Sequence, residues 1–230
     1  MSDIPEAKWE YSVNGGSGLC DIITDDIRVM QILDKLREDK AAGADELVSR
    51  FLGKIKHQLA CPLTILFNNI MKSGQVPADW KEANVVPVFK GGCRNVATNY
   101  RPISLTSQLS KVLETIVRDQ VVEFLEVNKL IRDSQHGFRK DSSCLTNTLL
   151  LLDKVLHSVD EGHDVDVVFL DLAKAFDKVP HKRLLEKLKK RGISGNILNV
   201  IEDWLKDRRQ RVCIKGRWSG WIRVWRGVLC

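Results

Sequence analysis

Apolar residues recur every three or four positions along much of the chain, which is the spacing of one face of an α-helix. The longest such pattern covers residues 107–128, where eight apolar residues share one face. The same spacing predicts six further helices. They span residues 25–43, 45–59, 61–74, 144–160, 180–191 and 194–207.

Capping residues support three of these helix boundaries. The run Thr24-Asp25-Asp26 is suited to cap the start of the first helix. Pro62 is expected in the first turn of the third helix, where a missing N–H costs nothing, and Gly74 is expected to end it.

Strand-like patterns occupy the intervals between the helices. Residues 85–90 and 100–105 predict a hairpin, and Pro87 places it at a sheet edge. Lys90 and Arg101 on this hairpin would bring two cations to one anion, because arginine favours bidentate phosphate contacts and lysine acts as a point charge. A second hairpin is expected from residues 211–214 and 221–224, closed around Lys215 and Gly216.

The run of residues 167–170 is apolar at every position, so it predicts a strand that is buried on both faces. Asp171 follows at once, and an unpaired charge at the end of a buried strand is costly. A divalent cation would compensate this charge. A helix cap or an ion pair with Lys174 or Lys178 would do so as well, and the local pattern does not choose between these readings.

Composition narrows the class of protein. The chain has 230 residues, of which 43% are hydrophobic and 29% charged, which suits one large domain or two small ones. No apolar run approaches the roughly 20 residues that span a bilayer, and the first residues lack the pattern of a signal peptide. Six cysteines are spread singly, without Cys-x-x-Cys pairs. We therefore expect an intracellular protein, nuclear or cytoplasmic, that is neither secreted nor bound to membranes and has no structural zinc.

Charge is distributed unevenly along the chain. Residues 181–230 hold 14 Lys and Arg against 4 Asp and Glu, whereas the other 180 residues hold 22 against 26. This asymmetry favours a polyanionic partner for the C-terminal part, although amphipathic helices with basic outer faces would also produce it.

Three tryptophans in this part, Trp218, Trp221 and Trp225, alternate with arginines and are able to stack on bases. Packing of Trp221 and Trp225 on one side of the hairpin is the alternative that we favour from the sequence.

Six phrases of the sequence, in a fixed order, form a more specific pattern. They are residues 76–81, 83–90, 99–106, 135–140, 143–147 and 169–181. Through them the chain resembles, from about residue 24 to residue 227, the fingers and first palm portion of the reverse transcriptase of a non-LTR (LINE-type, jockey-like) retrotransposon. Because several long phrases occur in the right order, chance does not account for the resemblance.

The resemblance implies an α/β (α+β) fold, with helix-rich fingers and a partial palm of a right-hand polymerase. We expect a flexible N-terminal segment at residues 1–20, a fingers-like region at 21–160 with an edge hairpin at 85–105, and a partial palm at 161–230. The partial palm would carry the Asp171 motif together with the basic C-terminal helices and hairpin.

The resemblance also implies roles for individual residues. Asp171 matches a catalytic aspartate that binds Mg²⁺, and Leu172 would offer its backbone carbonyl to the same ion. Lys90 and Arg101 match residues that hold the incoming triphosphate. Phe176 matches the bulky residue that rejects a 2′-hydroxyl, so the substrates would be deoxynucleoside triphosphates. Asp177 is expected only to form a cap or a hydrogen bond. For contacts to an RNA template and a DNA primer we expect Arg139, Lys140, Lys189, Lys190, Arg208 and Arg209.

The chain departs from the family pattern after Arg226. The family continues into a Ser-Gly-Val-Pro-Gln-Gly-Ser phrase, a hairpin with two adjacent aspartates and a thumb, and these motifs do not follow here. Asp171 would then be the only carboxylate of the metal site. We therefore expect an incomplete, inactive fragment with an exposed apolar sheet edge, unless a second chain completes the palm. A non-catalytic nucleic-acid-binding module and a functionless remnant are the alternatives.

Overall fold

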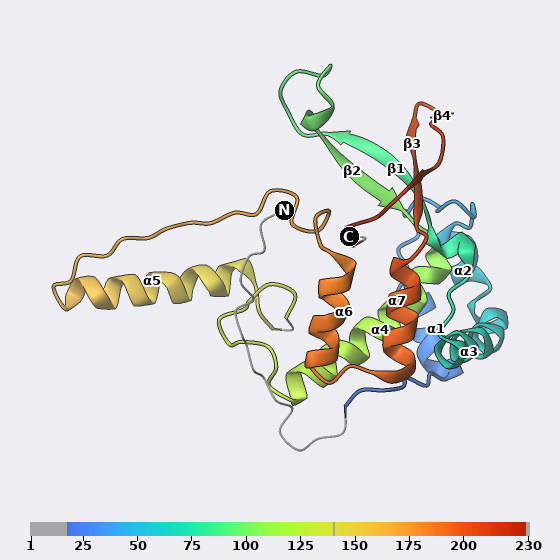
Figure 1. Cartoon of the computed structure of the whole chain (residues 1–230), viewed down its shortest axis with the longest axis horizontal. Coiled ribbons are helices and arrows are strands. Elements are labelled where there is room, and N and C mark those ends of the chain that lie inside the picture. Colours follow the sequence, from blue (N-terminus) through green and yellow to red (C-terminus); the bar gives the residue numbers. More distant parts are fainter. Residues whose placement is uncertain (1–17, 140, 229–230) are drawn as a thin grey trace.

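The computed structural model describes residues 18–139 and 141–228. Most of the expected flexible segment, residues 1–20, lies outside these ranges, as does Lys140. Within them the chain forms helices and a mixed sheet, which confirms the expected α/β class (Figure 1).

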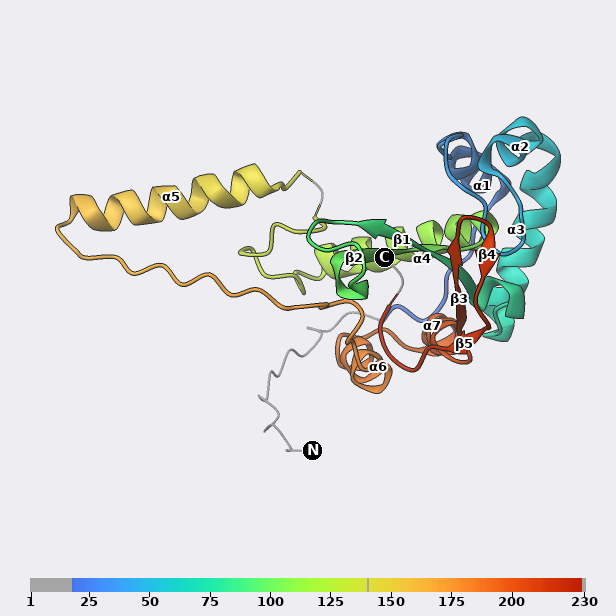
Figure 2. The ribbon, with the colours of Figure 1, turned by 90° about the horizontal axis from the view of Figure 1, so that it is seen from above.

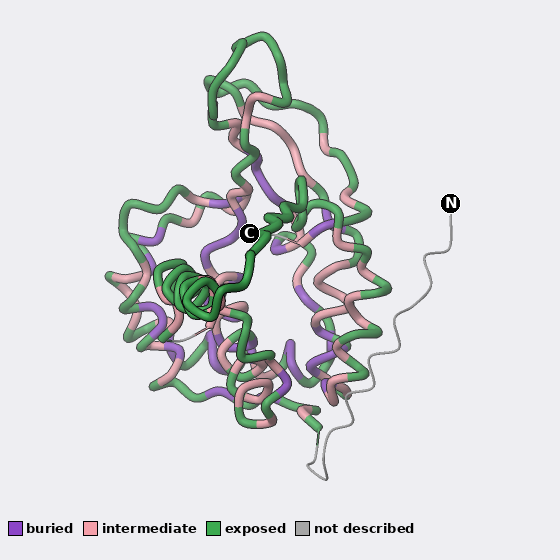
Figure 3. The backbone as a smooth tube through the Cα atoms, turned by 90° about the vertical axis from the view of Figure 1, so that its left-hand side faces the viewer, coloured by how far each residue is buried: buried purple, intermediate pink, exposed green. Residues whose placement is uncertain are grey.

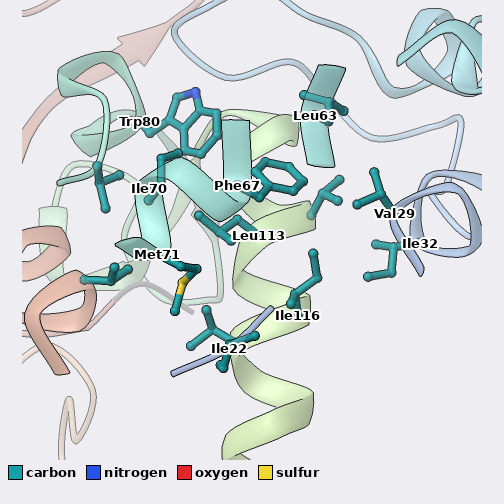
Figure 4. Packing of buried hydrophobic residues seen from close by; sticks show 14 of the residues in the cluster. Ile22, Val29, Ile32, Leu63, Phe67, Ile70, Met71, Trp80, Leu113 and Ile116 are labelled. Atoms are coloured by element: carbon teal, nitrogen blue, oxygen red, sulfur yellow. The ribbon is translucent and has the colours of Figure 1, made fainter. Parts of the chain in front are cut away.

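The main hydrophobic core lies between helices. It is built from α1 (Asp26–Asp34), α3 (Lys56–Ser73), α4 (Gln108–Val127) and α7 (Gly195–Leu205). Phe67 at its centre is fully buried and meets the Trp80 ring edge-on, with 6.1 Å between the ring centroids (Figure 4). The short helices α2 (Ser49–Lys54), η1 (Ala78–Lys81) and η2 (Ala97–Asn99) connect the larger elements, and α6 (His181–Lys190) packs beside α7.

Capping side chains fix the helix boundaries much as expected. The Asp25 carboxylate accepts a hydrogen bond from the Arg28 N–H at 2.7 Å at the start of α1, and Ser107 caps α4 in the same way. Gly74 ends α3 in the left-handed region, with φ of 71°.

Three helix predictions are wrong. The second helix, expected at residues 45–59, covers only Ser49–Lys54. The first helix ends at Asp34 and does not reach residue 43. Pro62 lies inside α3 and not in its first turn, because the helix already begins at Lys56. Pro62 is exposed, so the carbonyl group that loses its helical partner there lies on the solvent side.

The sheet has the order β2-β1-β3-β4, and β5 also pairs with β3. Its strands are β1 (Glu82–Phe89), β2 (Tyr100–Leu105), β3 (Arg209–Ile214), β4 (Arg217–Trp218) and β5 (Ile222–Arg223). Both expected hairpins are present, but the parallel pairing of β1 with β3 was not predicted. This parallel pairing ends at Val85, so no described strand lies on that side of β1 at Pro87. Proline has no backbone N–H to donate, and at this position no neighbouring strand needs one.

One part of the chain extends away from this body. It consists of α5 (Cys144–Asp160) and the extended residues 163–172, and we call residues 144–172 the arm (Figures 1 and 2). The arm stands outside the packed elements, and no residue of α5 is buried (Figure 3).

The predicted buried strand at residues 167–170 is wrong. These residues form no strand, and the side chains of Val168, Phe169 and Leu170 are 79%, 82% and 91% exposed. An apolar run becomes a strand only when a neighbouring strand pairs with its backbone, and none of the five described strands does so. The apolar surface that we expected at a sheet edge is therefore exposed on an extended segment.

Candidate nucleotide and nucleic-acid interface

The β1–β2 hairpin brings Lys90 and Arg101 to one face of the sheet. Val88 is paired with Arg101, and the Lys90 N–H donates to the Asn99 carbonyl at 3.0 Å. Since side chains alternate along a strand, residues 88, 90 and 101 share a face. Both cationic side chains are exposed, and neither forms an ion pair with a described carboxylate. The structure therefore brings together the two cations that the sequence suggested.

A pocket of about 260 Å³ opens on the opposite face. Pro102 and Ser104 of β2 line it together with Gln210 of β3, and their strand positions alternate with that of Arg101. Asp177 and Gly227 also line the pocket. Lys90 and Arg101 therefore do not point into the pocket, and an anion bound by them would lie across the sheet from Asp177.

Gly227 holds the turn that contains Phe176 and Asp177. The Gly227 N–H donates to the Val179 carbonyl at 2.9 Å, and the Val228 N–H donates to the Phe176 carbonyl at 3.1 Å. A Cβ at Gly227 would lie 2.9 Å from the backbone of Asp177, and its φ of 85° favours glycine as well. Close backbone packing therefore fixes Asp177 beside the pocket, whereas sequence reasoning gave it only a cap or a hydrogen bond.

Arg208 was expected to contact nucleic acid at the surface, and this prediction is wrong. Its side chain is buried, and its guanidinium donates to the Gly227 carbonyl at 2.9 Å. His181 Nε2 lies 2.8 Å from the same carbonyl oxygen. Burial lowers the pKa of Arg208, and the negative charge of Glu114 partly offsets this lowering. Burial also raises the pKa of Glu114, because it disfavours the charged form of either group. Arg208, the residue that precedes β3, thus ties the C-terminal segment to the start of that strand.

The other predicted nucleic-acid contacts have different surroundings. Lys189 and Lys190 are exposed at the end of α6. Arg139 lies 3.8 Å from the Asp133 carboxylate and donates to the Arg132 carbonyl, and Arg209 is paired with Glu82. Lys140 lies outside the described residues.

The predicted catalytic segment is not assembled into a metal site. Asp171 and Leu172 both lie on the exposed part of the arm. Among the described residues no three His, Cys, Asp or Glu side chains come together in a way that would hold a metal ion. These residues therefore do not fit a bound Mg²⁺ as they stand. Phe176 is half exposed and meets Phe138 edge-on, at 6.1 Å between ring centroids.

None of the helices that the structure describes is both long enough and apolar enough to cross a membrane.

Comparison with known proteins gives consistent matches. The sequence model of the family described as "Reverse transcriptase (RNA-dependent DNA polymerase)" matches residues 88–229. A probable RNA-directed DNA polymerase from transposon BS of Drosophila melanogaster is 28% identical over 197 residues, covering 84% of this chain and 22% of the relative.

Two further relatives show the same relation. The RNA-directed DNA polymerase from mobile element jockey of Drosophila melanogaster is 29% identical over 189 residues, covering 82% of this chain and 20% of the relative. A retrovirus-related Pol polyprotein from the type-1 retrotransposable element R2 of Popillia japonica is 28% identical over 156 residues, covering 67% of this chain and 21% of the relative. The chain thus spans about a fifth of the length of these relatives. The matches confirm the resemblance that the six sequence phrases indicated.

Proposed function

Because this chain belongs to the reverse transcriptase (RNA-dependent DNA polymerase) family, we propose that it is part of a retroelement polymerase and binds the incoming deoxynucleoside triphosphate. The observation that supports this role is the shared open face of Lys90 and Arg101.

The chemistry of this face suits a triphosphate. A guanidinium presents a planar fork that matches two phosphate oxygens, and a lysine ammonium adds a compact charge. Since no described carboxylate is paired with Lys90 or Arg101, their charges remain available to a ligand. Phe176 would contact the sugar and exclude a 2′-hydroxyl, and this role stays a prediction.

Polymerases of this family generally use divalent metal ions. We keep Asp171 as the predicted magnesium ligand, with the Leu172 carbonyl beside it, and such an ion would need further carboxylates to complete its ligands. The RNA template and the DNA primer would follow the exposed basic residues Lys189, Lys190 and Arg209 and the partly buried Arg139, with a possible second chain completing the palm.

Triphosphate binding tests the proposal directly. Titration of the chain with a fluorescent deoxynucleoside triphosphate should show roughly tenfold weaker binding for Arg101→Ala and for Lys90→Ala, since each loses a charge-assisted contact. Lys54→Ala is the matched control, because Lys54 is exposed on α2 and lies outside the hairpin. Equal affinities for all four proteins would refute the proposed role of the hairpin.

Primer extension tests the catalytic residue separately. The chain is mixed with an RNA template, a DNA primer, deoxynucleoside triphosphates and Mg²⁺, beside an Asp171→Asn variant. We expect no extension above background from either protein, because Asp171 lies on an exposed segment that is not held in the sheet. Extension that disappears with Asp171→Asn would show that this segment does assemble a working metal site.

A nucleic-acid-binding module without chemistry is the second candidate. The exposed Lys189 and Lys190 and the basic C-terminal hairpin favour it. Binding to nucleic acid that weakens steeply with salt and ignores sequence would support it, and no binding at low salt would exclude it.

A further inference from the structure

Arginine and tryptophan side chains alternate on one face of the C-terminal strands. The register pairs Cys213 with Trp218 and Arg209 with Arg223 across β3, β4 and β5. The alternation of side chains then places both partners of each pair on the face that also carries Arg211. We call this set the ladder; it comprises Arg209, Arg211, Trp218, Trp221, Arg223 and Trp225.

A β-bulge builds the centre of the ladder. Trp218 and Trp221 are three residues apart, so in a regular strand they would point to opposite faces. Here Cys213 opposes Trp218 and Gln210 opposes Ile222, which leaves both Ser219 and Gly220 opposite the single residue Val212. The Ser219 hydroxyl accepts the Val212 N–H at 2.9 Å in place of a regular strand partner. The extra residue brings both indoles to Arg211.

The Arg211 guanidinium lies between these two indoles. Its central carbon is 4.1 Å from the Trp218 ring centroid and 4.6 Å from that of Trp221, within the range of cation–π attraction. The outer contacts are longer, with Arg209 at 5.6 Å from Trp221 and Arg223 at 5.3 Å from Trp225.

A side chain of the neighbouring strand β1 also holds Arg211 in place. Its Nε donates to the Asn84 side-chain oxygen at 2.9 Å, and the buried Asn84 amide donates to the Gly43 carbonyl at 3.4 Å. Asn84 is neutral, so this contact fixes the guanidinium without cancelling its charge. Glu82 and Asp207 are paired with Arg209 and Arg223, whereas no described carboxylate is paired with Arg211.

The aromatic surface of the ladder remains open. The side chain of Trp218 is 50% exposed and that of Trp225 is 73% exposed. Large aromatic side chains contribute most to protein stability or to binding when they are buried. Residues 208–226 contain seven Lys and Arg and no Asp or Glu. Among the ladder arginines only Arg211 lacks a described carboxylate partner, so a ligand for this face should bring an anionic group to Arg211 and flat rings to the exposed indoles.

We propose that the ladder binds single-stranded nucleic acid, with bases stacked on the exposed faces of Trp218 and Trp225 and a phosphate group held by Arg211. Single strands fit because their unpaired bases are free to stack, whereas the bases of a duplex stack on one another. A lipid surface fits less well, because arginines separate the indoles and leave no continuous apolar patch to insert.

The proposal concerns residues other than those that we assign to triphosphate binding, so the two are tested apart. Anisotropy of a fluorescein-labelled uridine dodecamer, at low salt and without triphosphate or metal, measures binding to the ladder. We expect roughly tenfold weaker binding for Trp218→Ala, and intermediate binding for Trp218→Phe, which keeps a ring for stacking. Lys54→Ala should leave oligonucleotide binding within about twofold of the parent, because Lys54 is exposed on α2 and lies outside the ladder.

Phe51→Ala is the matched control, since Phe51 is an equally exposed aromatic residue, 52% against 50%, on α2. Circular dichroism of each variant shows whether the fold is kept, and the graded effect of Trp218→Phe separates stacking from loss of structure. A blunt RNA duplex of equal length should bind more weakly than the single strand.

Three results would overturn the proposal. They are unchanged oligonucleotide affinity in a folded Trp218→Ala variant, preference for the duplex, and a Trp218→Ala defect confined to binding of phosphatidylserine vesicles.

Discussion

The helical core and the arm contain similar apolar side chains in opposite surroundings. Phe67 in α3 is fully buried among α1, α4 and α7, whereas Phe169 in the arm is almost fully exposed. Both lie in strongly apolar stretches of the sequence. The difference between them is the presence of partners, because α3 meets three helices and residues 163–172 pair with no described strand. The hydrophobicity of a segment therefore indicates that it is stabilised by a packing partner, but it does not show whether such a partner is present.

Hydrogen exchange should show the largest contrast between the two regions. The amides of residues 164–172 donate no backbone hydrogen bond to a described residue, so we expect exchange within about tenfold of unprotected rates. Amides in the middle of α4 should be slowed by a factor on the order of 10³ or more, since they open only with the core. Mass spectrometry of peptides covers both segments, and slow exchange at residues 164–172 would mean that the arm is paired in solution.

The same substitution in both regions should differ strongly in its effect on stability. Phe67→Ala leaves a cavity beside Trp80 and should lower the free energy of unfolding by about 3–5 kcal/mol. Phe169→Ala should change it by less than about 0.5 kcal/mol, because the ring is already in water. Urea unfolding of the two variants checks this pair. A large loss of unfolding free energy with Phe169→Ala would show that the Phe169 ring is buried in the folded protein in solution.

A polar contact at the edge of the core should have a smaller effect. The Asp203 carboxylate of α7 accepts the Val76 N–H at 2.7 Å and pairs with Lys81 at 2.8 Å, and the Lys81 side chain is only 11% exposed. Asp203→Asn would leave this ammonium group without its counter-charge and should cost about 2 kcal/mol. Glu38→Gln, in an exposed pair with Arg50, should cost less than about 0.5 kcal/mol. Similar losses in both variants would contradict the role given to burial.

The smallest expected effect is on pH dependence. Burial raises the pKa of Glu114 above its ordinary value, against the attraction of Lys111 and Arg208. The folded protein therefore binds this proton more tightly than the unfolded chain does, and its contribution to stability is lost as pH rises through the raised pKa. Between about pH 4.5 and pH 7, Glu114→Gln should lose less stability than the parent chain. Urea midpoints measured across this range decide the matter, and parallel curves would contradict the assignment.

Local signals in the sequence were enough to locate the helices and the hairpins, although not every helix boundary. Asp25 and Gly74 act through neighbours within a few residues, so their roles could be recognised without the fold. Lys90 and Arg101 were found for the same reason, since a hairpin brings residues together across a short turn.

Features that depend on distant partners could not be predicted in this way. The strand expected at residues 167–170 requires a neighbouring strand, and its sequence cannot show whether one is in place. The burial of Arg208 depends on Gly227 and α4, and the position of Arg211 depends on Asn84 and on a bulge opposite Val212. Only the alternation of Arg and Trp in residues 208–226 could have pointed to the ladder, and we favoured simple packing for it.

The parallel pairing of β1 with β3 has a consequence for how fast the chain folds. Asn84 and Arg211, which meet across this pair, are 127 residues apart in the sequence. Contacts of such separation form late, because the entropy of the intervening loop is lost before the contact stabilises anything. The whole arm lies within that loop, and doubling the length of a flexible loop costs only about 0.6 kcal/mol. Insertions between residues 163 and 172 should therefore slow closure of the sheet only slightly, whereas any change that delays contact between α7 and α3 should slow folding of the entire body.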